Sequence, residues 1–324
     1  MKIWSFSMSA MLVGCIASSL SWAAYPERHI TLIVNFGPGG GTDLVARAAA
    51  AGAQKILGQP IVIVNQAGAG GTVGVAAIAS AKPDGYTIGV VTMTNLSMAP
   101  YILPVRYKSL EDFEFIGGIA KYIYGTSVPS NSPFKTLKDL IDYAKANPGK
   151  INYGVQGLST ANNVAMVRLS KATGVNMTPI PFKSTTDEVV SALGGTIDVT
   201  NQDPPVTVPQ IRAGKLRLLA SFSDQRWKWV PDVPTVKELG YDFSVSSYLG
   251  LAAPKGTPEP VMTLLRNTFK AVVQTQEFID AVDRIFLVAE YRDHVQWRKD
   301  VEAGLAENEV LTRELGLQYK SQQQ

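Results

Sequence analysis

The chain has 324 residues, 46% of them hydrophobic, enough to bury the core of one large domain or of two ordinary ones. Its charge is nearly balanced, with 30 basic and 27 acidic residues and a net charge of +3. Such a mild charge, without a basic run or interleaved aromatic residues, argues against nucleic acid as a partner and against binding to anionic membranes.

The first 23 residues have the three regions of an export signal. Lys2 supplies the positive charge, a mostly apolar stretch follows, and Ser21 and Ala23 are the small residues of a cleavage site. We therefore expect cleavage near Ala23 and an exported protein. The segment LVGC also matches a lipoprotein box, so lipid anchoring at Cys15 is the alternative. Cys15 is the only cysteine, so a chain cleaved at Ala23 has no disulfide.

Strands and helices alternate in the next part of the chain. Residues 29–36, 60–66 and 86–94 are short, apolar and bounded by turn residues, which predicts buried strands. A helix that ends at Gly58 and an alanine-rich helix after residue 71 lie between them. The first helix is expected to bury one face, made of Leu44, Val45, Ala48, Ile56 and Leu57.

A second α/β set follows, and then the chain becomes helical. Strands are predicted near the end of 137–157 and within 176–182, 196–202 and 216–223. Helices are predicted at the start of 137–157 and within 160–174, 185–195, 206–214, 260–274, 276–285 and 293–315. This alternation is typical of parallel sheets with crossover helices.

Three glycine-bearing turns separate a predicted strand from a predicted helix, at 37–41, 68–71 and 154–159. In open parallel sheets, ligands bind beyond the carboxyl ends of the strands, where helices begin. Helix N-termini offer free N–H groups and a partial positive charge, so they favour anions. If the three turns converge, they form a pocket of backbone donors.

Catalytic and cofactor motifs are absent or weak. Gly68, Gly70 and Gly74 suggest a dinucleotide turn, but the next predicted strand ends in threonines rather than an acidic residue. No lysine follows Gly41, which excludes a Walker loop, and the two histidines are far apart, which disfavours a metal centre. We therefore expect a binding protein and no enzyme, with no cofactor and no metal. Asp43 is interpreted as a helix cap rather than a ligand contact.

Several motifs, in this order, resemble those of one receptor family. They are YPERHITLIVNFGPGGGTDLVAR, VNQAGAGGTVG, KPDGYTI, GVNMTPIPFKS, LGGTIDV, IRAGKLRLLA, VPDVPTVKELG and LGLAAPKGTPEPV. Together they are similar to the periplasmic substrate-binding receptors of tripartite tricarboxylate transporters, also called Bug-type receptors. The resemblance implies an α/β type II periplasmic-binding fold, in which two lobes close on a ligand.

The resemblance also implies domain boundaries and partners. Domain 1 would comprise residues 25–123 and 248–324, and domain 2 residues 124–247. The protein would be a monomer that captures a small organic acid, such as a dicarboxylate, a tricarboxylate, an acidic amino acid or an aromatic acid. It would deliver this ligand to a permease of one large and one small membrane subunit. The alternative is a sensor that presents the ligand to a signalling protein.

Candidate ligand contacts come from both lobes. The resemblance implies, in domain 1, Phe36, Pro38, Gly39, Gly40, Thr42, Ala69, Gly70, Thr92 and Thr94, and in domain 2, Gly157, Ser159, Thr160, Asn162, Gln202 and Asp203. Lys183 is added as the expected pocket cation, with a surface lysine as the alternative.

Domain 2 departs from the family pattern at three places. Ser159 replaces a glycine, Asn162 and Asn163 replace a histidine pair, and Gln202 stands where an aspartate is usual. Gln202 is expected to remove a negative charge from the cleft wall while it both donates and accepts hydrogen bonds. The alternative is that Gln202 only caps a loop.

Overall fold

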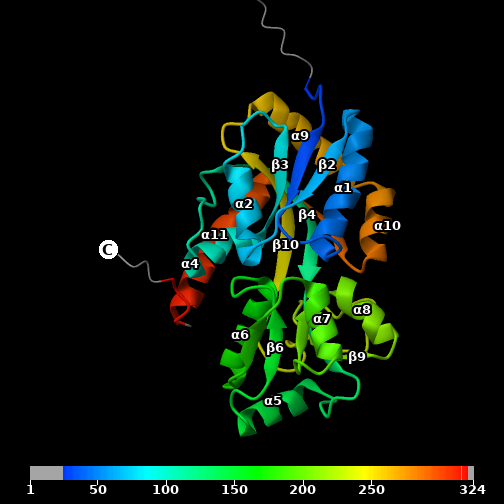
Figure 1. The fold of residues 1–324 in the computed structure, drawn as a ribbon, viewed down its shortest axis with the longest axis vertical. Coiled ribbons are helices and arrows are strands. Elements are labelled where there is room, and N and C mark those ends of the chain that lie inside the picture. Colours follow the sequence, from blue (N-terminus) through cyan, green and yellow to red (C-terminus); the bar gives the residue numbers. More distant parts are fainter. Residues whose placement is uncertain (1–24, 315, 320–324) are drawn as a thin grey trace, which may run out of the picture.

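The protein consists of two α/β lobes stacked along its long axis (Figure 1). The structure is a computed structural model that describes residues 25–314 and 316–319. The predicted signal segment and Cys15 therefore lie outside the described residues. We call lobe 1 the part built on β1 to β4, β10 and β11, and lobe 2 the part built on β5 to β9.

Lobe 1 is built on a six-stranded sheet in the order β11-β4-β10-β3-β1-β2. The neighbours β2, β1 and β3 are parallel, whereas β10 pairs antiparallel with both β3 and β4, and β11 pairs antiparallel with β4. The bounds are β1 Ile30–Val34, β2 Ile61–Asn65, β3 Thr87–Thr92, β4 Phe113–Ile123, β10 Ser246–Pro254 and β11 Val288–Asp293.

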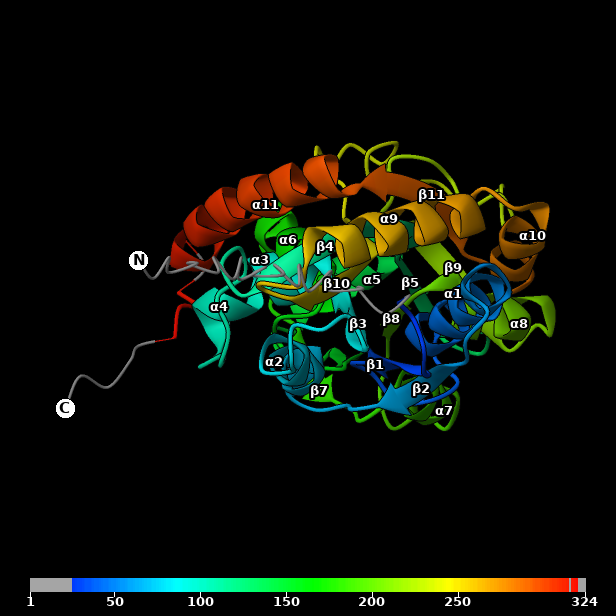
Figure 2. The same cartoon turned by 90° about the horizontal axis from the view of Figure 1, so that it is seen from above.

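Helices cover both faces of this sheet. One core joins the strands to α1 (Gly41–Leu57), α9 (Glu259–Val273) and α10 (Gln276–Arg284). The core of the other face joins them to α2 (Thr72–Ala79), α3 (Met93–Ser97) and α11 (His294–Glu314). The short turns η1 (Ala69–Gly71) and α4 (Ala99–Ile102) flank α2 and α3. Seen from above, α1 and α10 lie on one side and α2, α4 and α11 on the other (Figure 2).

The buried face of α1 differs from the predicted one. Val45 is buried as expected, but Leu44, Ala48 and Leu57 are only half-buried and Ile56 is 50% exposed. The packed face consists instead of small residues, Ala46, Ala49, Ala50 and Ala53. The reason is close helix packing, since a β-carbon on Gly52 would lie 2.7 Å from Val272 of α9. Larger side chains would not fit against α9 there.

Lobe 2 has a three-stranded sheet, β8-β5-β9, and a parallel pair, β6-β7. A bridge from Tyr153 to Val199 joins the two. The strands are β5 Gly125–Pro129, β6 Asn152–Val155, β7 Thr178–Pro181, β8 Thr200–Gln202 and β9 Leu216–Ser221. The helices are α5 Leu137–Ala146, α6 Ala161–Thr173, α7 Thr185–Leu193 and α8 Pro204–Arg212. Their main core includes residues of α5, α6 and the strands.

Two connections join the lobes. The chain passes from β4, which ends at Ile123, into β5, which begins at Gly125, and it returns to lobe 1 in β10, which begins at Ser246. Both β4 and β10 reach the junction of the lobes in Figure 1. Two α/β lobes joined in this way are the arrangement expected for an α/β type II periplasmic-binding fold. The exact domain boundaries, 25–123 with 248–324 and 124–247, stay a proposal.

The predicted helices and strands occur in the expected order, with β8 shorter than predicted. Four strands, β4, β5, β10 and β11, were not predicted from the sequence. The antiparallel half of the lobe 1 sheet, formed by β4, β10 and β11, was therefore not expected. Within the described ranges, no helix combines the length and the hydropathy needed to span a membrane.

Candidate ligand-binding site

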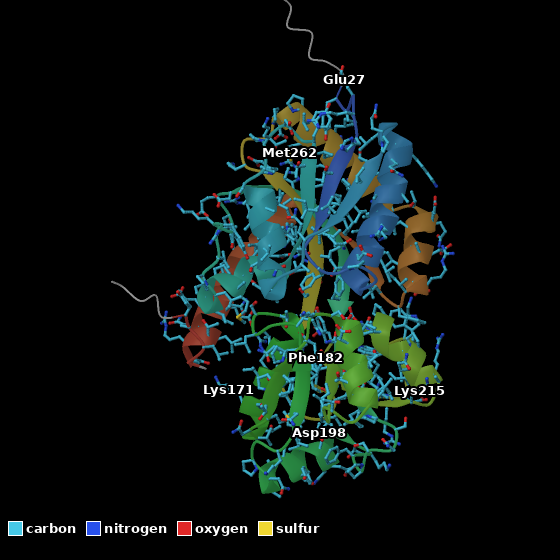
Figure 3. The ribbon with its side chains drawn as sticks, viewed as in Figure 1. Glu27, Lys171, Phe182, Asp198, Lys215 and Met262 are labelled. Atoms are coloured by element: carbon cyan, nitrogen blue, oxygen red, sulfur yellow. The ribbon has the colours of Figure 1, made fainter. Side chains whose placement is uncertain are left out.

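A cavity lies between the two lobes, with walls from both of them. Its empty space is about 780 Å³, including solvent at its open mouth. In Figure 3 the labelled Phe182 of lobe 2 lies near the level where the lobes meet, and Lys183, which lines the cavity, follows it in the chain.

The lobe 1 wall is formed by the start of α1. The N–H of Leu44 donates to the carbonyl of Gly40 at 3.0 Å, the first bond of the helix. The N–H groups of Gly41, Thr42 and Asp43 precede the regular ladder, as at every helix start. Gly40, Gly41 and Thr42 line the cavity, so this end of α1 offers donors and a partial positive charge there.

Asp43 shapes the turn before α1 instead of lining the cavity. Its Oδ2 accepts from the N–H of Gly39 and from Nε of Arg47, both at 2.9 Å, and its Oδ1 accepts from Asn65 at 2.9 Å. Burial alone would raise the pKa of Asp43, but these hydrogen bonds lower it below its usual value. The N-cap of α1 is Gly40, which has no side-chain cap bond, so Asp43 is not the N-cap residue; it lies in the first turn and holds the preceding turn through Gly39.

Lobe 2 adds two more helix N-termini. Residues Thr160, Ala161 and Asn162 at the start of α6 line the cavity, as do Ser184, Thr185 and Thr186 at the start of α7. Ser184 is the N-cap of α7 and accepts from the N–H of Asp187 at 3.1 Å. With α1, three helices of both lobes direct their positive ends at one cavity.

A buried carboxylate organises the amides behind the lobe 2 wall. Glu188 Oε2 accepts from Nε2 of Gln202 at 2.5 Å and from Nε2 of Gln156 at 2.7 Å. Its Oε1 accepts from the Thr200 hydroxyl at 2.7 Å and from the Asn201 N–H at 3.2 Å. Burial raises the pKa of Glu188, and the four hydrogen bonds counteract part of that effect. Gln202 is therefore not a loop cap.

Asp203 is the second carboxyl group at this wall. It is 5% exposed, lines the cavity and precedes α8 as its N-cap residue. Burial raises its pKa to about 7, and the nearby Glu188 adds to the increase, while its own backbone N–H opposes it. The expected loss of negative charge at Gln202 is thus offset, because Glu188 and Asp203 lie beside it.

The cavity includes residues that the sequence analysis missed. Tyr122 and Tyr124 come from the crossover between β4 and β5, and Ser247 comes from β10. Tyr122 donates to the Thr42 hydroxyl at 3.4 Å, and the hydroxyl of Ser247 has no partner among the described residues. The Ser184–Thr186 segment was also missed, although serine followed three residues later by Asp187 is a helix-start signal.

Most of the predicted contacts are brought together at this cavity. The lining includes Phe36, Pro38, Gly40, Thr42, Thr92, Thr94, Thr160, Asn162, Lys183, Gln202 and Asp203. Of the described lining residues, Lys183 is the one with a positive charge. Direct contact of these residues with a ligand stays a prediction.

Five of the predicted residues lie outside the lining: Gly39, Ala69, Gly70, Gly157 and Ser159. Their places in the fold explain this. The N–H of Gly39 is bonded to Asp43. The turns at Gly70 and Gly157 pack against each other across the lobes, since a β-carbon on Gly157 would lie 3.3 Å from Gly70 Cα. Of the three glycine turns, only 37–41 contributes its glycines to the cavity wall.

No cluster of three or more potential metal-ligating side chains occurs in the part of the chain that the structure describes.

A family model described as "Tripartite tricarboxylate transporter family receptor" matches residues 45–317.

The chain belongs to this receptor family. It is 34% identical over 293 residues to a protein of Cupriavidus necator, "UPF0065 protein in gbd 5'region", with 90% of this chain and 89% of that protein covered. It is also 34% identical over 269 residues to BugT of Bordetella pertussis, with 82% of each chain covered. The predicted resemblance to Bug-type receptors is therefore confirmed.

Solved structures of the same kind are also similar. The periplasmic binding protein BugD superposes with a TM-score of 0.86 at 31% identity, covering 91% of this chain and all of that one. MatC from Rhodopseudomonas palustris, with bound malate, gives a TM-score of 0.83 at 28% identity, covering 89% of this chain and 99% of that one. The expected α/β type II periplasmic-binding fold is confirmed, and one of the solved structures similar to this chain has a carboxylate bound.

Proposed function

We propose that this protein is a periplasmic receptor that captures a small carboxylate between its two lobes. The ligand class comprises dicarboxylates, tricarboxylates, acidic amino acids and aromatic acids. The receptor then delivers the ligand to a tripartite permease with one large and one small membrane subunit, and it acts as a monomer without catalytic activity.

One observation carries the proposal. The N-termini of α1, α6 and α7 meet at one cavity, and Lys183 stands at its wall. Backbone N–H groups at helix starts bind carboxylates well, because the donors are pre-oriented and the helix dipole is positive there. Since α1 belongs to lobe 1 and α6 and α7 belong to lobe 2, an anion between them favours the closed arrangement.

The malate-bound relative supports the same ligand chemistry. Family membership supports the periplasmic location and delivery to a permease. A sensor that presents its ligand to a signalling protein would use the same cavity. A neighbouring gene for a polytopic permease would favour delivery, whereas a neighbouring histidine kinase gene would favour sensing.

A thermal-shift screen of small carboxylates tests the proposed function. A ligand at 100 times its Kd should stabilise the native protein by about 2.7 kcal/mol and raise the Tm by several degrees. Calorimetry should then give one site per chain, and small-angle scattering should show a more compact molecule with ligand. A screen in which no carboxylate raises the Tm would refute the proposal.

A further inference from the structure

The carboxyl group of Asp203 is buried at the cavity, and one of its two oxygens has no partner in the local fold that the structure describes. An N-cap aspartate ordinarily accepts from the N–H of the second or third helical residue. In α8 the first two residues are Pro204 and Pro205, and Asp203 makes no side-chain cap bond. Proline has no N–H, so one of the usual donors is missing. Among the described residues, Oδ1 of Asp203 has no hydrogen-bond partner.

The neighbouring Gln202 is held with its donors turned away from any ligand. Its Nε2 donates to Glu188 Oε2 at 2.5 Å and to Gln156 Oε1 at 3.0 Å, which uses both of its N–H bonds. Glu188 also accepts from Nε2 of Gln156, and an ionised carboxylate can only accept. The group that Gln202 has left to offer is therefore its amide oxygen, Oε1.

The end of β8 is consequently a region of hydrogen-bond acceptors. Asp203 and Gln202 Oε1 lie there, with the Glu188 carboxylate behind them. The donors of the cavity are Lys183 and the starts of α1, α6 and α7. The start of α1 lies close to Asp203, since a β-carbon on Gly41 would be 2.9 Å from Asp203 Oδ2. A carboxylate placed against Asp203 would be repelled, whereas a hydroxyl or an ammonium group would complete its hydrogen bonds.

We propose that the receptor selects a carboxylate that also carries a hydroxyl or ammonium donor, and that Asp203 and Gln202 Oε1 bind this donor. The carboxylate group of the same ligand binds at Lys183 and the helix N-termini. A plain polycarboxylate without such a donor binds more weakly. This inference rests on the proposed function, and it narrows the ligand class.

The pH dependence of binding follows from the groups around Asp203. These are Glu188 of α7, Tyr122 of β4, Tyr124 between β4 and β5, and Lys183 at the same cavity. Burial keeps the pKa of both tyrosines above the usual value, so they stay neutral. A bound donor favours ionised Asp203, so its binding strengthens as pH rises through about 7. A plain diacid favours protonated Asp203, and its binding weakens over the same range.

Calorimetry with matched probes tests the inference. The probes are succinate, malate and aspartate, and, as a shorter set, propanoate, lactate and alanine, measured between about pH 6.5 and 8.5. Malate, aspartate or both should bind at least tenfold more tightly than succinate, and the comparison distinguishes a hydroxyl from an ammonium donor. Asp203→Asn should reduce this preference to less than about threefold and remove its pH dependence. Asp232→Asn, at an exposed carboxyl of lobe 2 outside the lining, is the matched control and should keep both.

The outcomes separate the two proposals. If carboxylates bind without a preference for the donor, or if Asp203→Asn retains the preference, the inference fails and the proposed function stands. If no carboxylate of the screen or of the probe sets binds, both fail. Should Asp203→Asn not fold, the unsubstituted protein decides, because whichever of malate and aspartate binds more tightly must then show a pH trend opposite to that of succinate.

Discussion

At the residue scale, Asp203 shows how sequence neighbours determine the state of a buried group. Pro205 removes a donor that would have bonded the carboxyl group, and burial among Tyr122, Tyr124 and Glu188 disfavours its charge. A buried carboxyl without a partner destabilises a protein unless a ligand or a proton compensates it. We therefore expect Asp203 to lower the free energy of unfolding and to be retained because it binds the ligand.

The pKa of Asp203 makes a prediction about stability. Its folded value of about 7 lies above the ordinary value of 3.8, so the folded state holds the proton more tightly. The contribution of this protonation to the free energy of unfolding is fully present below about pH 4. It is lost as pH rises to about 7, at roughly 1.4 kcal/mol for each pH unit in between. Asp203→Asn should remove this decrease in the free energy of unfolding, measured by urea unfolding at a series of pH values from 4 to 8. Parallel curves for the variant and the unsubstituted protein would contradict it.

At the element scale, the packing of α11 on the sheet depends on glycine in β10. A β-carbon on Gly250 would lie 2.6 Å from Cε2 and 2.7 Å from Cζ2 of Trp297, which is fully buried. Gly118 of β4 also faces this ring, and a β-carbon added to it would lie 3.2 Å from Cε3 of Trp297. The indole thus lies directly on the two strands that connect the lobes.

Gly250→Ala should lower the free energy of unfolding by about 1–3 kcal/mol, because a rigid ring cannot yield to the added methyl group. Urea unfolding of this variant, of Trp297→Phe and of the double variant completes a double-mutant cycle. The smaller phenyl ring should relieve the clash, so the double variant should lose less stability than the sum of the single ones. Additive losses would show that Gly250 and Trp297 do not contact each other.

At the scale of the whole molecule, the lobes are in contact on both sides of the cavity. On one side Arg168 and Lys171 of α6 pair with Glu307 and Glu314 of α11, and on the other Lys228 pairs with Asp283. Exposed ion pairs of this type contribute little each. The backbones at Gly70 and Gly157 also approach closely across the lobes, since a β-carbon on Gly157 would lie 3.3 Å from Gly70 Cα.

Gly70→Ala should weaken ligand binding by hindering closure. Its φ is +66°, and the new β-carbon would lie 3.1 Å from Ser159 Oγ of the other lobe. Gly174→Ala is the matched control, because φ is +71° there and nothing lies within 4 Å. Both variants should lose about 1 kcal/mol of stability to backbone strain. Only Gly70→Ala should bind at least tenfold more weakly and remain extended with ligand in small-angle scattering. Equal affinities for the two variants would contradict a role in closure.

The pairing of the strands that were not predicted from the sequence also depends on the whole molecule. β4 and β10 pair over most of their length although more than 100 residues separate them, and register shifts interrupt their ladder. Gly117, Gly118 and Gly250 also weaken the local strand pattern of these segments. Partners so far apart in the sequence leave no local signal of pairing.

Local patterns in the sequence by themselves determined the alternation of parallel strands and helices, the glycine turn at 37–41 before α1 and, through ordered motifs, the family. The first two features depend on periodicity and turn chemistry, which act between near neighbours, whereas the family was indicated by a resemblance of the ordered motifs. Only the tertiary structure decided that Glu188 orients Gln202, that Oδ1 of Asp203 has no partner among the described residues and that the turns at Gly70 and Gly157 contact each other. Each of these facts depends on burial and on contacts between distant segments, which no local pattern encodes.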